Sequence, residues 1–116
     1  EIVKERRRIM KILHLGIPVQ RKTMEHQYTY VEPIKLHVTN ADNHEYKLQY
    51  VYPERESPLP ESVKTENHLA IEVENIEDEI KNFDEILYPP IDVFGKMKIC
   101  FVRKENIIFE LTEFLN

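Results

Sequence analysis

Two short stretches of the chain are nearly identical: HLGIPV at 14–19 and HLAIEV at 68–73. Each begins with histidine, and in each the residues alternate between a mixed face and a face of branched apolar side chains. This period of two is typical of a β-strand with one apolar face. A repeat of this kind strongly restricts the fold, and we interpret the chain as a duplicated structural unit.

The second copy is followed by a predicted helix. Asn75 is a suitable N-cap, and acidic residues fill the next turn, where the helix dipole favours negative charge. Pro89 and Pro90 are expected to end the helix. Residues 96–103 and 106–114 then alternate as the two strands of a hairpin. The predicted apolar stripe of the helix consists of Ile76, Ile80, Phe83 and Leu87.

The first copy is followed by residues 20–29, which are polar and carry no helical stripe, so we predict a loop with at most one turn. Few residues separate the first predicted strand from the next one, too few for a full crossover helix. Residues 30–39 and 45–53 alternate as strands joined by a turn. Residues 53–67 hold three of the seven prolines and many charges, which predicts a surface connection.

The expected order is therefore β–loop–β–β followed by β–α–β–β, an α+β fold in one domain. Two such units can lay their sheets side by side as a curved, half-open barrel. We divide residues 1–116 into a first module (10–53), a connection (54–67) and a second module (68–116). Because Met10 directly precedes the first strand, we expect translation to begin there and residues 1–9 to be a non-native extension; the alternative is a short charged arm or helix.

Composition excludes several classes of function. The net charge of −5 disfavours nucleic acid as a partner, and no apolar run approaches the ~20 residues that span a membrane. The single cysteine, Cys100, excludes an internal disulfide and fits a reducing, cytoplasmic location. Because Cys100 lies within an apolar strand, we predict that it belongs to the core and is not a nucleophile.

Four polar side chains are predicted to share the concave face. His14 and His68 begin the two modules, and alignment of KLQYV with IFELT pairs Gln49 with Glu110 on the last strands. Two imidazoles, one carboxylate and one amide oxygen suit a divalent transition metal with positions left open for a substrate. Cobalt, nickel, manganese, zinc and iron all remain candidates.

These stretches resemble the vicinal oxygen chelate superfamily, the group of glyoxalases, bleomycin-resistance proteins and extradiol dioxygenases. The resemblance rests on HLGIPV, HLAIEVENIEDEI and IIFELTEF, and ESPLPESVKTENHLAIEVENIEDEI is nearest the methylmalonyl-CoA epimerase branch. It implies paired βαβββ modules, here with a truncated or missing first helix, and a homodimer. It also implies metal ligation by His14, Gln49, His68 and Glu110, with Glu32 as the nearest match to a catalytic base.

The resemblance implies a metal-dependent enzyme that acts on a small carbonyl or carboxylate substrate. A divalent metal would act as a Lewis acid, and Glu110 or Glu32 would move a proton next to the carbonyl. This chemistry is that of an epimerase, an isomerase or a glyoxalase-type lyase. An iron-dependent dioxygenase remains an alternative, since two histidines and one carboxylate suit that metal as well.

Two readings from other classes also remain open. One is a metal-free small-molecule-binding protein on the same scaffold, because a fold alone does not establish catalysis. The other is a domain that assembles with partners through strands 30–39 and 45–53. The remaining histidines, His26, His37 and His44, lie in polar segments, and we expect them to be solvated.

Overall fold

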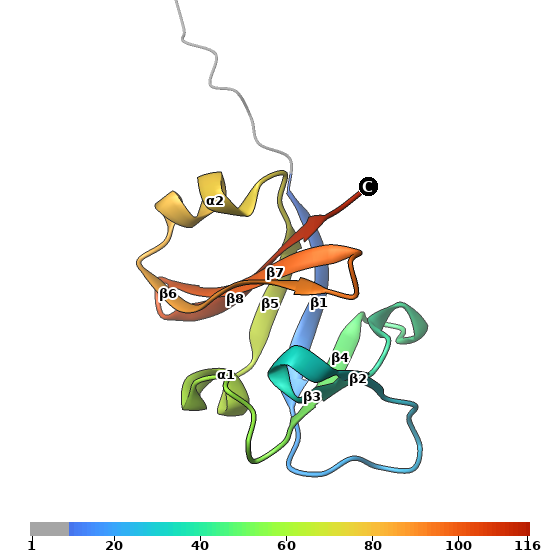
Figure 1. The fold of residues 1–116 in the computed structure, drawn as a ribbon. Coiled ribbons are helices and arrows are strands. Elements are labelled where there is room, and N and C mark those ends of the chain that lie inside the picture. The colour runs from blue at the N-terminus through green and yellow to red at the C-terminus, as the bar shows by residue number, and fades with distance from the viewer. Residues whose placement is uncertain (1–9) are drawn as a thin grey trace, which may run out of the picture.

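The computed structural model describes residues 10–116, which form one mixed sheet of eight strands that curls into a half-barrel (Figure 1). The expected status of residues 1–9 lies outside the described residues. The order of the strands across the sheet is β2-β3-β4-β1-β5-β8-β7-β6. Their bounds are β1 (Lys11–Pro18), β2 (Thr29–Val31), β3 (Leu36–Val38), β4 (Leu48–Pro53), β5 (His68–Glu72), β6 (Glu85–Val93), β7 (Met97–Lys104) and β8 (Ile107–Phe114). The helical segments are η1 (Glu32–Ile34), η2 (Ala41–Asn43), α1 (Glu61–Thr65), α2 (Ile76–Glu79) and η3 (Ile80–Asn82).

The two copies of the repeat lie side by side at the centre of the sheet. Strands β1 and β5 pair antiparallel, with His14 opposite Ala70 and Gly16 opposite His68. Each of these strands also pairs parallel with the last strand of its own module, β1 with β4 and β5 with β8. The predicted α+β architecture of two related modules in a curved, half-open barrel is confirmed. The described stretch 19–28 contains no helix, as the polar sequence of that segment predicts.

The first module contains one more strand than the sequence pattern predicts. The predicted strand 30–39 is wrong, because η1 divides it into the short antiparallel strands β2 and β3. Pro33 lacks the N–H that a strand would donate, and Lys35 adopts a left-handed φ of 48° that reverses the chain. The first module therefore ends in three strands, and the second module also ends in three, because β6 adds a strand to the two that the sequence pattern predicts there.

The predicted helix of the second module is too long. Helical structure ends at Asn82, and Pro89 and Pro90 lie inside β6 instead of stopping a helix. Strand β6 is at the edge of the sheet, where the missing proline N–H groups leave no ladder partner unsatisfied, and its pairing with β7 is irregular between Tyr88 and Ile91. Leu87 consequently packs with the strands on the other side of the sheet and not on the helix.

The connection between the modules is only partly a surface segment. Its α1 helix buries Val63, and Leu59 just before it is also buried. The hydroxyl of Ser57 donates a hydrogen bond to the carbonyl of Ile34 at 2.5 Å, which ties the connection to the first module. Because 53–67 is rich in prolines and charges, its sequence pattern does not indicate that two of its residues belong to the core.

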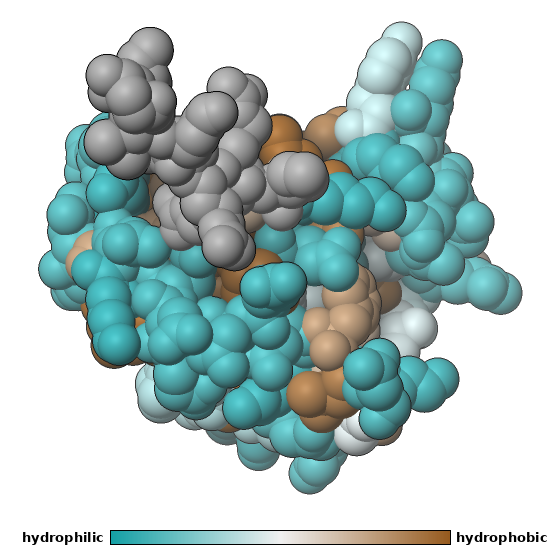
Figure 2. Space-filling model, turned by 90° about the horizontal axis from the view of Figure 1, so that it is seen from above, coloured by the Kyte–Doolittle hydropathy of each residue, from teal (hydrophilic) through white to brown (hydrophobic). Residues whose placement is uncertain are grey.

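Two separate cores cover the two faces of the sheet. On the outer face, α2 and η3 pack against β5, β7 and β8, and Cys100 is fully buried there, as predicted. On the inner face, residues of both modules and α1 form the second core. The view in Figure 2 shows a mainly hydrophilic surface with small hydrophobic areas between the polar side chains. Among the described residues, no helix is long and apolar enough to cross a membrane.

Candidate metal centre

His14, His68 and Glu110 come together on the inner face of three adjacent strands. They lie on β1, β5 and β8, which are neighbours in the sheet. In the register of these strands Ala70 is opposite His14 on one side and opposite Glu110 on the other. Ala70 is fully buried, and because its side chain is a single methyl group, the longer side chains can meet above it.

The three side chains converge closely. The Nε2 atom of His14 lies 3.3 Å from Oε1 of Glu110, and Nε2 of His68 lies 3.0 Å from the same oxygen. One potential ligand atom from each residue lies within 4.8 Å of the others. The side chain of His68 is 2% exposed and that of Glu110 12%. Two nitrogens and one oxygen at this spacing, shielded from water, suit a divalent transition metal.

The histidine nitrogens lack the hydrogen bonds that a purely structural role requires. Nε2 of His14 and both ring nitrogens of His68 are buried with no aligned hydrogen-bond partner among the described residues. The two Nε2 atoms lie at ion-pair distances from Oε1 of Glu110, but not in the geometry of a hydrogen bond. Buried polar atoms without partners cost free energy and occur rarely except at functional sites. The donor set therefore fits a metal ion better than a closed hydrogen-bond network.

Electrostatics keep the carboxylate of Glu110 ionised. Burial by itself raises the pKa of this carboxyl, but the contacts with His14 and His68 outweigh burial and hold the pKa far below its ordinary value. A carboxylate that stays ionised at neutral pH is ready to act as a metal ligand. The two histidines thus favour the form of Glu110 that ligation needs.

Gly16 provides the space for His68. A β-carbon at position 16 would overlap the Cε1 and Nε2 atoms of the His68 ring. The edge of that ring also faces Phe101, with 5.3 Å between ring centroids. The small residue of the first repeat copy therefore positions the imidazole of the second copy.

A cavity of about 310 Å³ opens above these three residues, and it has walls from both modules. His14, His68 and Glu110 line it, and so does Gln49 on β4. The Nε2 amide of Gln49 donates to the carbonyl of Thr39 at 3.0 Å, which fixes the side chain at the cavity wall. Ligation by Gln49 stays a prediction.

Glu32 does not reach the cavity. It is exposed in η1 and is not among the residues that line the cavity. Besides Glu110, the carboxylate among the described lining residues is Asp42, which is exposed and pairs with Lys47 at 3.0 Å. Sequence reasoning missed Asp42 because it lies in the turn NADNH, where an acidic residue is ordinary turn chemistry.

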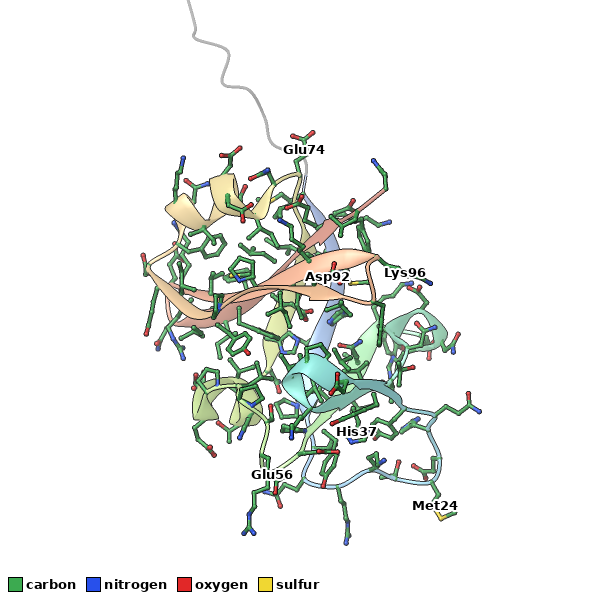
Figure 3. The ribbon with its side chains drawn as sticks, in the orientation of Figure 1. Met24, His37, Glu56, Glu74, Asp92 and Lys96 are labelled. Carbon is green, nitrogen blue, oxygen red and sulfur yellow. The ribbon has the colours of Figure 1, made fainter. Side chains whose placement is uncertain are left out.

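His26 is exposed, as expected from its polar segment, whereas His37 and His44 are partly buried, contrary to that expectation. His37 is half-buried, and its Nε2 lies 2.9 Å from Oε2 of Glu54. Figure 3 labels it among the strands of the first module, away from the cavity that holds the metal ligands. His26 and His44 both contact the ring of Tyr50. These aromatic contacts lie on the side of the first module where the helix is missing.

Comparison with known proteins supports the fold alone. No family model matches the chain, and no curated protein matches it. Among solved structures, the crystal structure of the hypothetical protein BH1468 from Bacillus halodurans is similar, with a TM-score of 0.60 and 19% sequence identity. The match covers 94% of this chain and 97% of that chain. The curled mixed sheet and this similarity are compatible with the fold of the vicinal oxygen chelate superfamily.

Proposed function

We propose that the protein is a metal-dependent enzyme of the vicinal oxygen chelate type. His14, His68 and Glu110 would hold one divalent metal ion, and Gln49 would complete the set. The observation that carries the proposal is the convergence of two imidazoles and one carboxylate within 4.8 Å in a cavity, with histidine nitrogens that lack other partners. Such a metal, when bound, supplies Lewis-acid polarisation of substrate oxygens.

The side chains around the cavity suit proton transfer on a small carbonyl or carboxylate compound. Glu110 lines the cavity beside both histidines, where a substrate oxygen bound at the metal would bring the neighbouring carbon close to it. It is therefore the residue to which we assign the movement of a proton from a carbon next to a carbonyl. The mainly apolar walls would exclude water once a substrate fills the cavity, which strengthens the electrostatic effect of the few polar groups. Epimerase, isomerase and glyoxalase-type lyase reactions all use this step.

Elemental analysis of protein purified without chelator or metal-affinity resin tests the metal site. We expect near one equivalent of cobalt, nickel, manganese, zinc or iron per chain, which His68→Ala loses. His37→Ala is the matched control, because His37 is also a half-buried strand histidine beside a carboxylate but lies outside the cavity. Failure of the wild-type protein to bind metal even after reconstitution would overturn the proposal.

Proton transfer is tested in protein loaded with metal, and Glu110→Gln removes both proposed roles of Glu110, ligand and base. Metal-loaded protein in D₂O should exchange the C–H next to the carbonyl in one or more members of a panel of small 2-oxo and 2-hydroxy carbonyl compounds, followed by NMR. Glu110→Gln should abolish the exchange. Equal exchange with wild type and Glu110→Gln would remove Glu110 from the proton-transfer role.

The alternative function is a small-molecule-binding protein that uses the same cavity without a metal. The observation in its favour is the mainly apolar lining, which can hold a ligand by burial alone. Binding of an apolar probe with equal affinity to metal-free wild type and His68→Ala, together with no metal binding, would favour it.

A further inference from the structure

The turn between β6 and β7 places an aromatic residue in a conformation that aromatic residues avoid. Phe94 has a φ of 58° and Gly95 a φ of 68°. The N–H of Lys96 donates to the carbonyl of Val93 at 3.0 Å, which closes the turn. Two consecutive left-handed residues form a type I′ turn, in which asparagine, aspartate and glycine are preferred at the first position. A phenylalanine there is strained, because its β-carbon is crowded by the backbone.

A second turn of the same chain has the same backbone conformation but carries polar side chains. Glu105 and Asn106, between β7 and β8, adopt the same two left-handed conformations, with φ values of 52° and 70°. Both residues there are polar, and neither lines the cavity. The two turns differ in position, since the β6–β7 turn is at the cavity and the β7–β8 turn is not. The same left-handed conformation thus carries a polar side chain away from the cavity and an apolar side chain at the cavity, which points to a role for the Phe94 ring there.

Phe94 lines the cavity but stays 57% exposed. Met97 and Phe114, which pair across β7 and β8, line the cavity beside it. We call Phe94, Met97 and Phe114 the apolar rim. Figure 3 labels Asp92 and Lys96, which flank the turn on either side; Asp92 fixes the turn by accepting a hydrogen bond from the N–H of Gly95 at 2.8 Å. These hydrogen bonds fix the backbone of the turn, whereas the side chains of Phe94 and Phe114 remain largely exposed.

The charge of the cavity favours a ligand with an uncharged apolar group over one with an additional anionic group. Within residues 10–116, no lysine or arginine lines the cavity, and its two carboxylates are Glu110 and Asp42. A ligand that carries a further anionic group, such as a second carboxylate or a phosphate, would find no cation to compensate its desolvation. An uncharged apolar substituent would bury its surface against the rim at no such cost.

We propose that Phe94 is a specificity-determining residue, which selects ligands that carry an uncharged apolar substituent next to the oxygens bound at the metal centre. This inference rests on the proposed metal centre. The apolar rim recognises the substituent, and the turn places Phe94 at the edge of the cavity. The ligand class is a compact oxygen chelator with an apolar side group and no second anionic group.

Three hydroxamates test the inference with Co²⁺-loaded protein. Acetohydroxamate has the chelating group alone, benzohydroxamate adds an apolar ring, and succinate monohydroxamate adds a carboxylate. We expect wild type to bind benzohydroxamate about tenfold or more tightly than succinate monohydroxamate, measured by titration calorimetry. Equal affinity for these two probes would overturn the inference.

Phe94→Asn and Glu105→Asn form a matched pair of variants. Both place asparagine at the first position of a type I′ turn, so both should raise the Tm. Phe94→Asn should weaken benzohydroxamate binding about tenfold and leave Co²⁺ and acetohydroxamate binding unchanged, whereas Glu105→Asn should change none of the three. Unchanged benzohydroxamate affinity in Phe94→Asn would overturn the role of Phe94. Failure of wild type to bind Co²⁺ would instead overturn the proposed function, and the inference with it.

Discussion

Gly16 and His68 lie opposite each other on β1 and β5, and the His68 ring occupies the space that a side chain at position 16 would fill. The first repeat copy thus provides the room in which the histidine of the second copy turns toward Glu110, 3.0 Å away. The duplication does more than repeat a strand: it makes each copy part of the environment of the other.

Replacement of Gly16 by alanine should therefore damage the metal centre. The added methyl group would push the His68 ring away from Glu110, so we expect Co²⁺ affinity to fall about tenfold or more and stability to fall by about 1–3 kcal/mol. Titration calorimetry and urea unfolding measure the two effects. Gly95→Ala is the control, because no atom lies within 4 Å of a β-carbon there and only its left-handed φ of 68° is strained. Full Co²⁺ affinity in Gly16→Ala would argue against His68 as a ligand.

Glu110 and Glu113 allow a test of the carboxylate that separates ligation from folding. A ligand that binds only the folded state at 100 times its Kd adds about 2.7 kcal/mol of stability, so Co²⁺ should raise the Tm of wild type. Glu110→Gln should lose this rise. Glu113→Gln should keep it, because Oε1 of Glu113 accepts a hydrogen bond from the N–H of Ile76 at 3.0 Å on the outer face. The measurement is a thermal melt with and without Co²⁺, and a Co²⁺-dependent rise in Glu110→Gln would contradict the assignment.

Cys100 should be inert in the folded protein. Burial, together with the nearby charge of Glu77, raises the pKa of its thiol from 9.0 to about 11. Its Sγ–H donates to the carbonyl of Tyr88 at 3.1 Å. We expect iodoacetamide at pH 8 to label Cys100 only after unfolding in urea, as mass spectrometry would detect.

The same pKa shift sets the sign of a pH effect on stability. The folded thiol keeps its proton at a pH where the unfolded thiol loses it. The contribution of Cys100 to the stability of the folded state is therefore intact below pH 9 and is lost as the pH rises toward about 11. Wild type should therefore lose more stability than Cys100→Ala between pH 9 and 11. An equal loss in both proteins would show that Cys100 does not contribute.

The cap of α2 should affect stability but not the metal centre. The side chain of Asn75 accepts a hydrogen bond from the N–H of Asp78 at 2.9 Å. Asn75→Ala should destabilise the protein by about 1 kcal/mol and leave Co²⁺ affinity unchanged, since α2 packs on the outer face. Asn82→Ala is a control substitution outside the cap; a loss of stability equal to that of Asn75→Ala would show that the cap is unimportant.

The amino-acid sequence was sufficient to predict the duplicated modules, the curved sheet and the missing first helix. These features follow from local patterns: alternation in HLGIPV and HLAIEV, and the absence of a helical stripe in 20–29. The hairpin of β7 and β8 follows from the same alternation and is confirmed. Cys100 was correctly assigned to the core, because its neighbours in the strand are apolar.

The errors lie where tertiary structure overrides local preference. Pro89 and Pro90 normally end a helix or a strand, but an edge strand tolerates them because its outer N–H groups need no partner. The charged connection buries Leu59 and Val63 because they pack against the apolar inner face of the sheet. No local sequence pattern indicates this contact.

The sequence by itself determined which chemical groups this protein can offer: two repeated strand histidines and an inward carboxylate. Only the tertiary structure decided that His14, His68 and Glu110 meet, because their distances depend on which strands are neighbours and on the small residues Gly16 and Ala70 between them. It likewise left Glu32 outside the cavity and brought Phe94 to it. Side-chain alternation is local, whereas strand order and the curl of a sheet depend on the whole chain.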